Sequence, residues 1–390
     1  MKICACVAEY NPFHLGHLKH IDYMKTVLGA DKIIVIMSGN FTQRGEPAVC
    51  DKFTRARWAV LSGADMVIEL PTVFATANAE IFAKGAINVL GALGCVDGLC
   101  FGVESGDKEA YLSLAEAMND ESKEFKKALK EKLDGGISLA KAKFEALKSL
   151  GREDLDQNLI SSPNNILGLE YTKAILKNKC GIDIYPMIRD GDHNDKTLKK
   201  GITSATSIRE VLKSGEKKKI KKSVPPFVYT DIKEYPYAFN KLIMASVLKN
   251  SADYMAKIVD CTEGLENRIK AFSKDNNDVE TLVEKVSTKR YTQARVRRIL
   301  TANFLGIDKY MIEDCLESKL YAKILAVDEN AKDLISIVNS YSSVPVLTRK
   351  SDVSSLKKTA LKCFELDVLA NDLYNLSTGN KQNENLTLFV

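Results

Sequence analysis

The sequence predicts an α/β fold with a doubly wound parallel sheet, followed by a mostly helical C-terminal part. Short apolar runs rich in β-branched residues recur in the first half of the 390-residue chain, and helical patterns separate them. Such runs are typical of parallel strands that are buried on both faces and joined by helical crossovers. After residue 226 the apolar residues mostly follow a helical period.

Five runs are predicted as strands of one sheet. They are residues 2–7, 32–37, 66–70, 98–103 and 182–188. Each run ends in polar or glycine-containing residues or in proline, and ligands of such sheets bind beyond the carboxyl ends of the strands. Cys4 and Cys6 alternate with small apolar residues on the first run, so we expect them to be packed.

The chain is predicted to have two parts. Residues 1–212 form the α/β part, which contains a charged helical insertion at about 106–151, interpreted as a structural insert rather than a lid or an RNA surface. A lysine-rich run and two prolines form a basic linker at 213–226. Residues 227–390 are predicted as a helical domain with a loosely ordered tail after Ser377. Its expected helices are 237–248, 265–271, 279–285, 292–305 and 320–327.

Composition limits the possible classes of protein. The net charge of +5 is too small to indicate nucleic-acid binding by itself. We find no apolar run of about 18 residues, so no membrane span is expected and a cytoplasmic location is predicted. Nine cysteines without a C-x-x-C pair indicate reduced thiols rather than disulfides or a zinc site, and no metal-ligating residues are predicted.

The most informative segment runs from Asn11 to His17, with the sequence Asn-Pro-Phe-His-Leu-Gly-His. It follows the first predicted strand and precedes a helix expected to begin near Leu18. A helix N-terminus offers unpaired N–H groups, and glycine lets the backbone approach a phosphate. His14 and His17 can each donate to a phosphate oxygen without a fixed charge. An isolated histidine pair would more often be solvated or bind a metal, but this position favours a nucleotide triphosphate.

Two further places at strand ends can carry chemistry. In the polar loop of residues 40–52, the side chains of Gln43, Arg44 and Lys52 can reach phosphates or a small carboxylate, with a solvated loop as the alternative. Gly102 ends the fourth strand, where a base or ribose can stack on bare backbone.

The string Ala-Glu-Tyr-Asn-Pro-Phe-His-Leu-Gly-His at residues 8–17 resembles the HxGH motif of the nucleotidyltransferase superfamily. More closely it resembles the tRNA(Met) cytidine acetate ligase family, and the resemblance extends over essentially the whole chain. It implies an enzyme that uses ATP to activate acetate as acetyl-adenylate and passes the acetyl group to the wobble cytidine of elongator tRNA(Met). Mg²⁺ is expected to bridge the leaving pyrophosphate, and no protein partner is implied.

The resemblance also assigns roles to residues. His14 and His17 are the expected catalytic residues at the triphosphate. Independently of the resemblance, the polar loop after the second strand is the best-placed source of a donor that binds acetate beside the α-phosphate, and Asn40 and Arg44, with Gln43 behind them, are the candidates. The residues expected to bind ATP are Val7, Ala8, Glu9, Tyr10, Asn11, Pro12, Phe13, His14, Leu15, Gly16, His17, Leu18, Lys19, His20, Gly102, Asn164, Arg189, Ser204, Thr206 and Arg209.

Besides Gly102, three segments of this set lie far from the motif. Asn164 suits a helix cap or first turn, and it matches, like Arg189, a residue that contacts ATP in the family. Residues 203–209 are similar to the second superfamily signature, Ile-Ser-Ser-Thr-x-Ile-Arg, but have Thr203 for Ile and Ala205 for Ser. The phosphate-binding groups that remain there belong to Ser204, Thr206 and Arg209. His193, in a loop rich in Asp and Gly, is left out of the site.

Residues 289–298, Lys-Arg-Tyr-Thr-Gln-Ala-Arg-Val-Arg-Arg, place four arginines and a tyrosine at a helix start. Arginine with an aromatic side chain suits RNA, although a basic helix paired with acidic neighbours fits equally well. The segment resembles the R-Y-T-x-x-R-x-x-R string of the family, which favours a tRNA surface together with the lysine run 213–222. The residues concerned are Arg290, Tyr291, Arg295, Arg297 and Arg298.

Two other functions remain open from the sequence. A small-molecule adenylyltransferase of cofactor synthesis would use the same motif, but it has little use for the long helical half. A non-catalytic RNA-binding protein on a nucleotide-binding fold is the other alternative. The intact His14, Gly16 and His17 argue against it.

Overall fold

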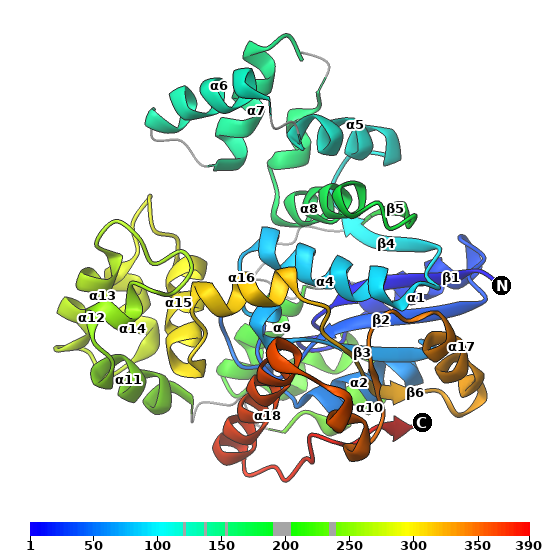
Figure 1. Cartoon of the computed structure of the whole chain (residues 1–390). Helices are drawn as coiled ribbons and strands as arrows, with labels where there is room; N and C mark the ends of the chain where they lie inside the picture. Colours follow the sequence, from blue (N-terminus) through cyan, green and yellow to red (C-terminus); the bar gives the residue numbers. More distant parts are fainter. Residues whose placement is uncertain (120–121, 136–138, 153–154, 190–203, 234–238) are drawn as a thin grey trace.

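The computed structural model describes residues 1–119, 122–135, 139–152, 155–189, 204–233 and 239–390 (Figure 1). Its central sheet contains the five predicted strands, all parallel, with bounds within one residue of the prediction. They are β1 (Ile3–Ala8), β2 (Lys32–Ser38), β3 (Met66–Leu70), β4 (Gly98–Val103) and β5 (Asp183–Ile188).

The strand order β3-β2-β1-β4-β5 confirms the doubly wound topology. The chain begins with β1 in the middle, builds outward through β2 and β3, and then returns to the other side of β1 for β4 and β5. The order therefore reverses between β1 and β4, and such a switch point opens a crevice at the carboxyl ends of the strands. The motif of residues 11–17 follows β1 directly.

Apolar side chains alternate between the two faces of the sheet. Along β1, Ile3 and Ala5 face one layer of the core, whereas Cys4 and Cys6 face the other, which confirms that these cysteines are packed. The helices of the first layer are α3 (Thr72–Ala75), α4 (Ala79–Leu93) and α8 (Pro163–Asn178). Those of the second are α1 (Leu15–Thr26), α2 (Lys52–Leu61), α9 (Ala205–Lys213) and α10 (Pro226–Asp231).

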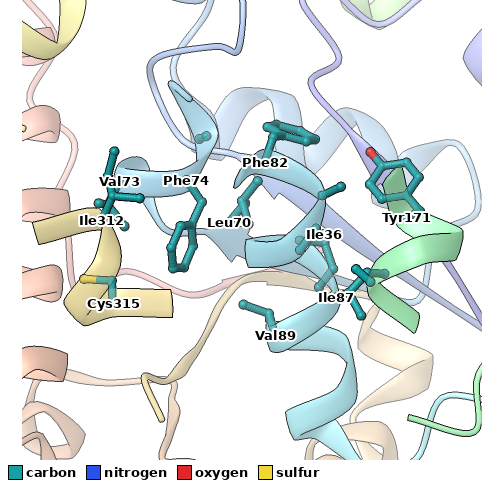
Figure 2. Packing of buried hydrophobic residues seen from close by; sticks show 14 of the residues in the cluster. Ile36, Leu70, Val73, Phe74, Phe82, Ile87, Val89, Tyr171, Ile312 and Cys315 are labelled. Carbon is teal, nitrogen blue, oxygen red and sulfur yellow. The ribbon is translucent and has the colours of Figure 1, made fainter. Parts of the chain in front are cut away.

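The first layer continues into the C-terminal half of the chain. Figure 2 shows Ile36 and Leu70 of the sheet and Ile87 of α4, and beyond them Ile312 and Cys315 of α16 (Lys309–Glu317) in the same core. A helix from the second half thus shares a core with the sheet. No helix within the described residues is long and apolar enough to span a lipid bilayer.

The predicted insertion consists of helices, as expected. Figure 1 shows them beyond α8, on which α5 packs through Tyr111 and its neighbours. They are α5 (Lys108–Met118), α6 (Lys123–Asp134) and α7 (Leu139–Ser149), and a short helical turn, Gln157–Ile160, follows them.

Four of the five helices predicted in the second half are confirmed, although the start of the first lies outside the described residues. They are α11 (Phe239–Lys249), α13 (Leu265–Ser273), α14 (Val279–Val286) and α15 (Gln293–Leu305). The other elements are α12 (Ala252–Met255), α17 (Asp333–Tyr341), α18 (Lys358–Thr378) and the short turns Glu329–Ala331 and Lys350–Ser355.

The fifth predicted helix, at 320–327, is wrong. These residues form β6 (Ala322–Val327), which pairs antiparallel with β3 and extends the sheet. Two short strands, β7 (Val346–Leu347) and β8 (Leu388–Phe389), pair with the other edge of β6. A six-residue run that is apolar except for Lys323 is compatible with a buried strand or a buried helix, and the neighbour of β6 in the sheet lies far away in sequence.

The predicted tail and the predicted linker are both packed against the rest of the protein. Glu384, in the tail after Ser377, is buried against Lys52 and Lys323, so the expectation of a loosely ordered tail is wrong. The lysine-rich run predicted as a linker forms a 3₁₀ turn, η2 (Lys217–Lys222), whose Ile220 is buried in the second layer. Both segments are therefore part of the body that carries the crevice.

Candidate active site

The two motif histidines cap the first helix together. Nδ1 of His14 accepts the backbone N–H of Gly16 at 3.0 Å, and Nδ1 of His17 accepts the backbone N–H of His14 at 3.2 Å. The two rings stack with their centroids 3.7 Å apart. Because each Nδ1 is an acceptor, a neutral ring carries its proton on Nε2. The local backbone thus fixes the same tautomer in both residues.

Burial keeps these imidazoles neutral. It lowers the pKa of His14 to about 3, with the charges of Arg189 and Arg209 adding to the effect. Burial and then the neighbouring His14 hold the pKa of His17 well below its usual value. The pKa of His20 falls to about 4, mainly through burial. His14 and His17 therefore present two neutral Nε2–H donors, a form that can bind phosphate oxygens without a proton transfer.

The backbone N–H groups at the start of α1 are already used. Leu15 N donates to the carbonyl of Ser223 at 3.2 Å, and His17 N donates to the carbonyl of His14 at 2.9 Å. Gly16 N is held by His14, as described above. The expectation of unpaired N–H groups at this helix start is therefore wrong, because the capping histidine and the turn after η2 occupy them. The helix also begins three residues earlier than predicted.

The other expected turn residues surround this pair. Tyr10 and Phe13 pack against the ring of His17, with centroid distances of 4.9 and 5.4 Å. Nε2 of His20 lies 3.2 Å from Sγ of Cys100 on β4. Val7 and Ala8 end β1, residues 9–13 form the turn, and residues 15–20 form the first turns of α1.

Arg209 approaches the turn from α9. Its Nη1 donates to the carbonyl of Asn11 at 2.8 Å, and its Nη2 lies 3.3 Å from Oγ1 of Thr206. Ser204 caps α9 by accepting the backbone N–H of Ser207 at 3.1 Å. Arg209 is largely buried, so its charge acts on the crevice with little screening. Thr203 and His193 lie outside the described residues.

Arg189 reaches the crevice from the end of β5. Its side chain crosses Gly102, where an added Cβ would lie 2.9 Å from Cδ of the arginine, so the glycine makes room for this crossing. Glu104 lies close enough to raise the pKa of Arg189, although burial lowers it overall. The carboxylate of Glu104 accepts hydrogen bonds from Ser162 and from Asn164, which lies in the first turn of α8. Asn164 therefore positions Glu104, the carboxylate beside Arg189.

Two side chains of the polar loop after β2, those of Asn40 and Lys52, are buried in the protein interior. The carboxamide of Asn40 donates to Oδ1 of Asn371 at 3.0 Å and accepts the backbone N–H of Lys52 at 2.7 Å. Nζ of Lys52 lies 2.7 Å from both Glu69 and Glu384, wholly buried. The expectation that Lys52 reaches phosphates is therefore wrong, because its charge is needed inside.

Arg44, in contrast, belongs to the charges around the crevice. The pKa of Arg44 is lowered, mainly by burial and then by the charge of Arg209, and the charges of Glu9 and Glu46 oppose this effect. Oε1 of Glu9 accepts the backbone N–H of Gln43 at 2.7 Å, which joins this loop to the phosphate turn. Of the two residues expected to bind acetate, Arg44 lies beside Arg209 and Asn40 is held by groups of the protein.

One residue that the sequence reasoning missed holds the crevice together. The guanidinium of Arg55 is wholly buried and donates to four backbone carbonyls of the described residues. Nε donates to Cys50 at 2.9 Å, Nη1 to Glu9 at 2.6 Å and to Ser38 at 3.0 Å, and Nη2 to Gly39. The chain after β1 is thereby tied to the chain after β2. Its only signal in the sequence was a place on the helix after the polar loop.

Known proteins resemble the chain over its whole length. A family model described as HIGH Nucleotidyl Transferase matches residues 1–387. The tRNA(Met) cytidine acetate ligase of Acetivibrio thermocellus is 36% identical over 398 residues, which cover 97% of this chain and 96% of the relative. The enzyme of the same name from Clostridium novyi is 35% identical over 387 residues, covering 96% and 95%.

Solved structures agree with this result. Thermotoga maritima TmcAL bound with alpha-thio ATP has a TM-score of 0.91 and 29% identity, and the match covers 100% of both chains. The apo form of the same protein gives a TM-score of 0.94. The chain belongs to the tRNA(Met) cytidine acetate ligase family of HIGH nucleotidyl transferases.

Proposed function

We propose that this chain uses ATP to activate acetate as acetyl-adenylate and then transfers the acetyl group to the wobble cytidine of elongator tRNA(Met). The observation that carries the proposal is the pair of neutral Nε2–H donors of His14 and His17 at the switch point, beside Arg189 and Arg209. Relatives named tRNA(Met) cytidine acetate ligase and a structural neighbour bound with alpha-thio ATP support it.

In the first step, an acetate oxygen attacks the α-phosphorus and the bond to pyrophosphate breaks. Negative charge builds up on the leaving pyrophosphate, where preorganised donors act most strongly. His14, His17 and Arg209 are the groups proposed to supply them. Because acetate is itself the nucleophile, the enzyme has only to position acetate and ATP and to stabilise the charge on the leaving pyrophosphate. In keeping with this, burial raises the pKa of the nearby Cys6 thiol to about 12, far from a reactive thiolate.

Mg²⁺ fits this site as an ion carried by the triphosphate. No group of three or more His, Cys, Asp or Glu side chains within the described ranges is arranged to hold a metal. Mg²⁺ commonly binds to substrate phosphates and water rather than to a cage of protein ligands. It would offset charge on the pyrophosphate, while Arg189 and Arg209 supply fixed positive charge from the protein.

In the second step, the exocyclic amine of the cytidine attacks the acetyl carbonyl and AMP leaves. The acceptor must therefore reach the motif histidines, and the turn η2 lies beside them because the carbonyl of Ser223 binds Leu15. Lys218, Lys221 and Lys222 are exposed on this turn, and no carboxylate of the described residues pairs with them. We propose these lysines as contacts for RNA phosphates.

The arginine segment of residues 289–298 contributes less open surface than expected. Arg290 is exposed, with 67% of its side chain accessible, whereas 15% of Arg297 and 19% of Arg298 are accessible. Arg295 donates to a backbone carbonyl, and its guanidinium lies 5.2 Å from the ring centre of Tyr291. Acidic or backbone partners thus engage these arginines, and we propose Arg290 as their outermost RNA contact.

Exchange of labelled pyrophosphate into ATP tests the first step without RNA. Acetate-dependent exchange supports the proposal, exchange that depends on a nucleotide or pantetheine phosphate supports a small-molecule adenylyltransferase, and absence of exchange supports a non-catalytic RNA-binding protein. Transfer of labelled acetyl to tRNA(Met) then tests the second step.

Salt dependence tests the lysine turn. Changing its three lysines to Gln should weaken tRNA binding and flatten the salt slope by about 0.7–0.9 per lost phosphate contact. Pyrophosphate exchange should be unchanged. The matched control is the same change at three exposed lysines of α6, Lys126, Lys127 and Lys130. An equal effect of both triple variants would count against a specific role of η2.

A further inference from the structure

One carboxylate is shared between the two halves of the chain. Glu46, near the tip of the loop between β2 and α2, has Oε2 3.8 Å from Nε of Arg209 and Oε1 3.5 Å from Nε of Arg297. Arg209 lies on α9 and Arg297 on α15, and all three side chains are largely buried. Solvent and salt therefore screen these two pairs only weakly.

The tip of this loop is fixed against α15, which Figure 1 shows on the side of its helical group that faces α16. Gly45 has a φ of +73°, and a Cβ there would lie 2.5 Å from the backbone of Arg297, so only glycine fits. The carbonyl of Gly45 accepts from Oγ1 of Thr301 at 2.8 Å. The carbonyl of Glu46 accepts from the N–H and the Oγ1 of Thr42, both at 3.0 Å. Glu46 thus stays beside α15.

The other end of the bridge reaches the motif. Nη1 of Arg209 donates to the carbonyl of Asn11, three residues before His14. The carboxylate of Glu46 forms an ion pair with the same guanidinium, with Oε2 3.8 Å from Nε, which is beyond hydrogen-bond distance. Glu46 therefore lies between the arginine of the motif turn and the helix of residues 293–305 and forms an ion pair with each.

We propose that Glu46 is a positioning residue that holds Arg209 on the motif turn and couples α15 to ATP binding. An RNA phosphate near Arg297 competes with Glu46 for that guanidinium, so the carboxylate pairs more fully with Arg209. Arg209 is then better ordered for ATP. By reciprocity, tRNA and ATP each tighten the binding of the other by the same factor. The inference rests on ATP and tRNA as the ligands of the proposed function.

The first test measures acetyl-adenylate formation by the full chain without RNA. Glu46→Gln keeps the shape of the side chain but removes its charge, and we expect the KM for ATP to rise about tenfold. The thermal midpoint should stay near that of the wild type, and the KM for ATP should rise more than the KM for acetate, since Glu46 also acts on the charge of Arg44; loss of structure would not give this split. Glu46→Asp keeps the charge and should recover part of the ATP affinity.

The second test measures the Kd of ATP, without acetate, in the presence and absence of tRNA(Met). The wild type should bind ATP about fivefold or more tightly with tRNA, and the ratio should fall to about 1 in Glu46→Gln. Glu280→Gln is the matched control, because Glu280 pairs with Arg297 from the solvent side and forms no pair with Arg209; its ratio should match the wild type.

A wild-type ratio of 1, or an unchanged ratio and ATP KM in Glu46→Gln, overturns the role of Glu46 while leaving acetate activation intact. A wild type that forms no acetyl-adenylate instead removes the proposed function, and this inference with it.

Discussion

His14 has two separable roles, which the variant His14→Asn can distinguish. Nδ1 caps α1 by accepting the N–H of Gly16, which leaves Nε2–H as the donor that the proposed function requires. Asn is among the best N-cap residues, so its side-chain oxygen can take over the cap while the donor at the Nε2 position is lost. The structure therefore predicts a folded protein with an impaired chemical step.

The two contributions have different sizes. Loss of a positioned donor to developing charge costs about 2.7–4 kcal/mol in the transition state, which lowers the rate by two to three orders of magnitude. Loss of an N-cap costs about 1 kcal/mol of stability. For a chain of this length that is a shift of about 1 °C in the thermal midpoint. His14→Ala should show both losses, and His14→Asn only the first.

The assay is single-turnover formation of acetyl-adenylate from saturating ATP and acetate without RNA, combined with urea unfolding of the same preparations. A near-normal rate in His14→Asn would show that the imidazole acts only as a cap. A rate that falls in proportion to stability in both variants would refute the separation of the two roles.

Three further predictions follow from the site. Because the pKa values of His14 (about 3) and His20 (about 4) are lowered in the folded protein, the unfolded chain binds protons below pH 6.5 that the folded chain does not. The free energy of unfolding, measured with urea, should therefore fall from pH 7 to pH 5, and it should fall less steeply in His14→Asn. In separate saturation curves, Arg44→Ala should raise the KM for acetate far more than the KM for ATP, whereas Asn40→Ala should lower the free energy of unfolding. A change in the KM for ATP alone, in both variants, would place the acetate pocket elsewhere. Glu384→Gln removes a buried partner of two lysines and should cost about 3–5 kcal/mol in urea unfolding, and an unchanged midpoint would mean that water reaches this cluster.

The parallel strands could be predicted from sequence because local patterns specify them. A run such as residues 32–37 is apolar, β-branched and bounded by turn residues, so its type and length are both evident. Residues 322–327 carry the same kind of signal in a region where helices dominate. Their strand state depends on pairing with β3, which is remote in sequence, and no local pattern records it.

The chemistry of the site divides in a similar way. The positions of His14 and His17 were evident from their spacing at the first βα junction. Their shared tautomer was not, because it depends on which backbone N–H groups meet each Nδ1. The contacts of Arg55 with backbone carbonyls and the burial of Lys52 could not be predicted either, because the segments involved are brought together only by the fold.

The antiparallel strand β6 has a consequence for how the protein is made. The ribosome synthesises β1 to β5 well before residues 322–389. Until then the edge of β3 is unpaired, and Lys52 and Glu69 lack their later partners Glu384 and Lys323. Exposed strand edges invite pairing with other chains. Productive folding is thus expected to be late and nearly simultaneous for both halves, and expression of residues 1–212 alone should yield aggregates rather than an isolated catalytic domain.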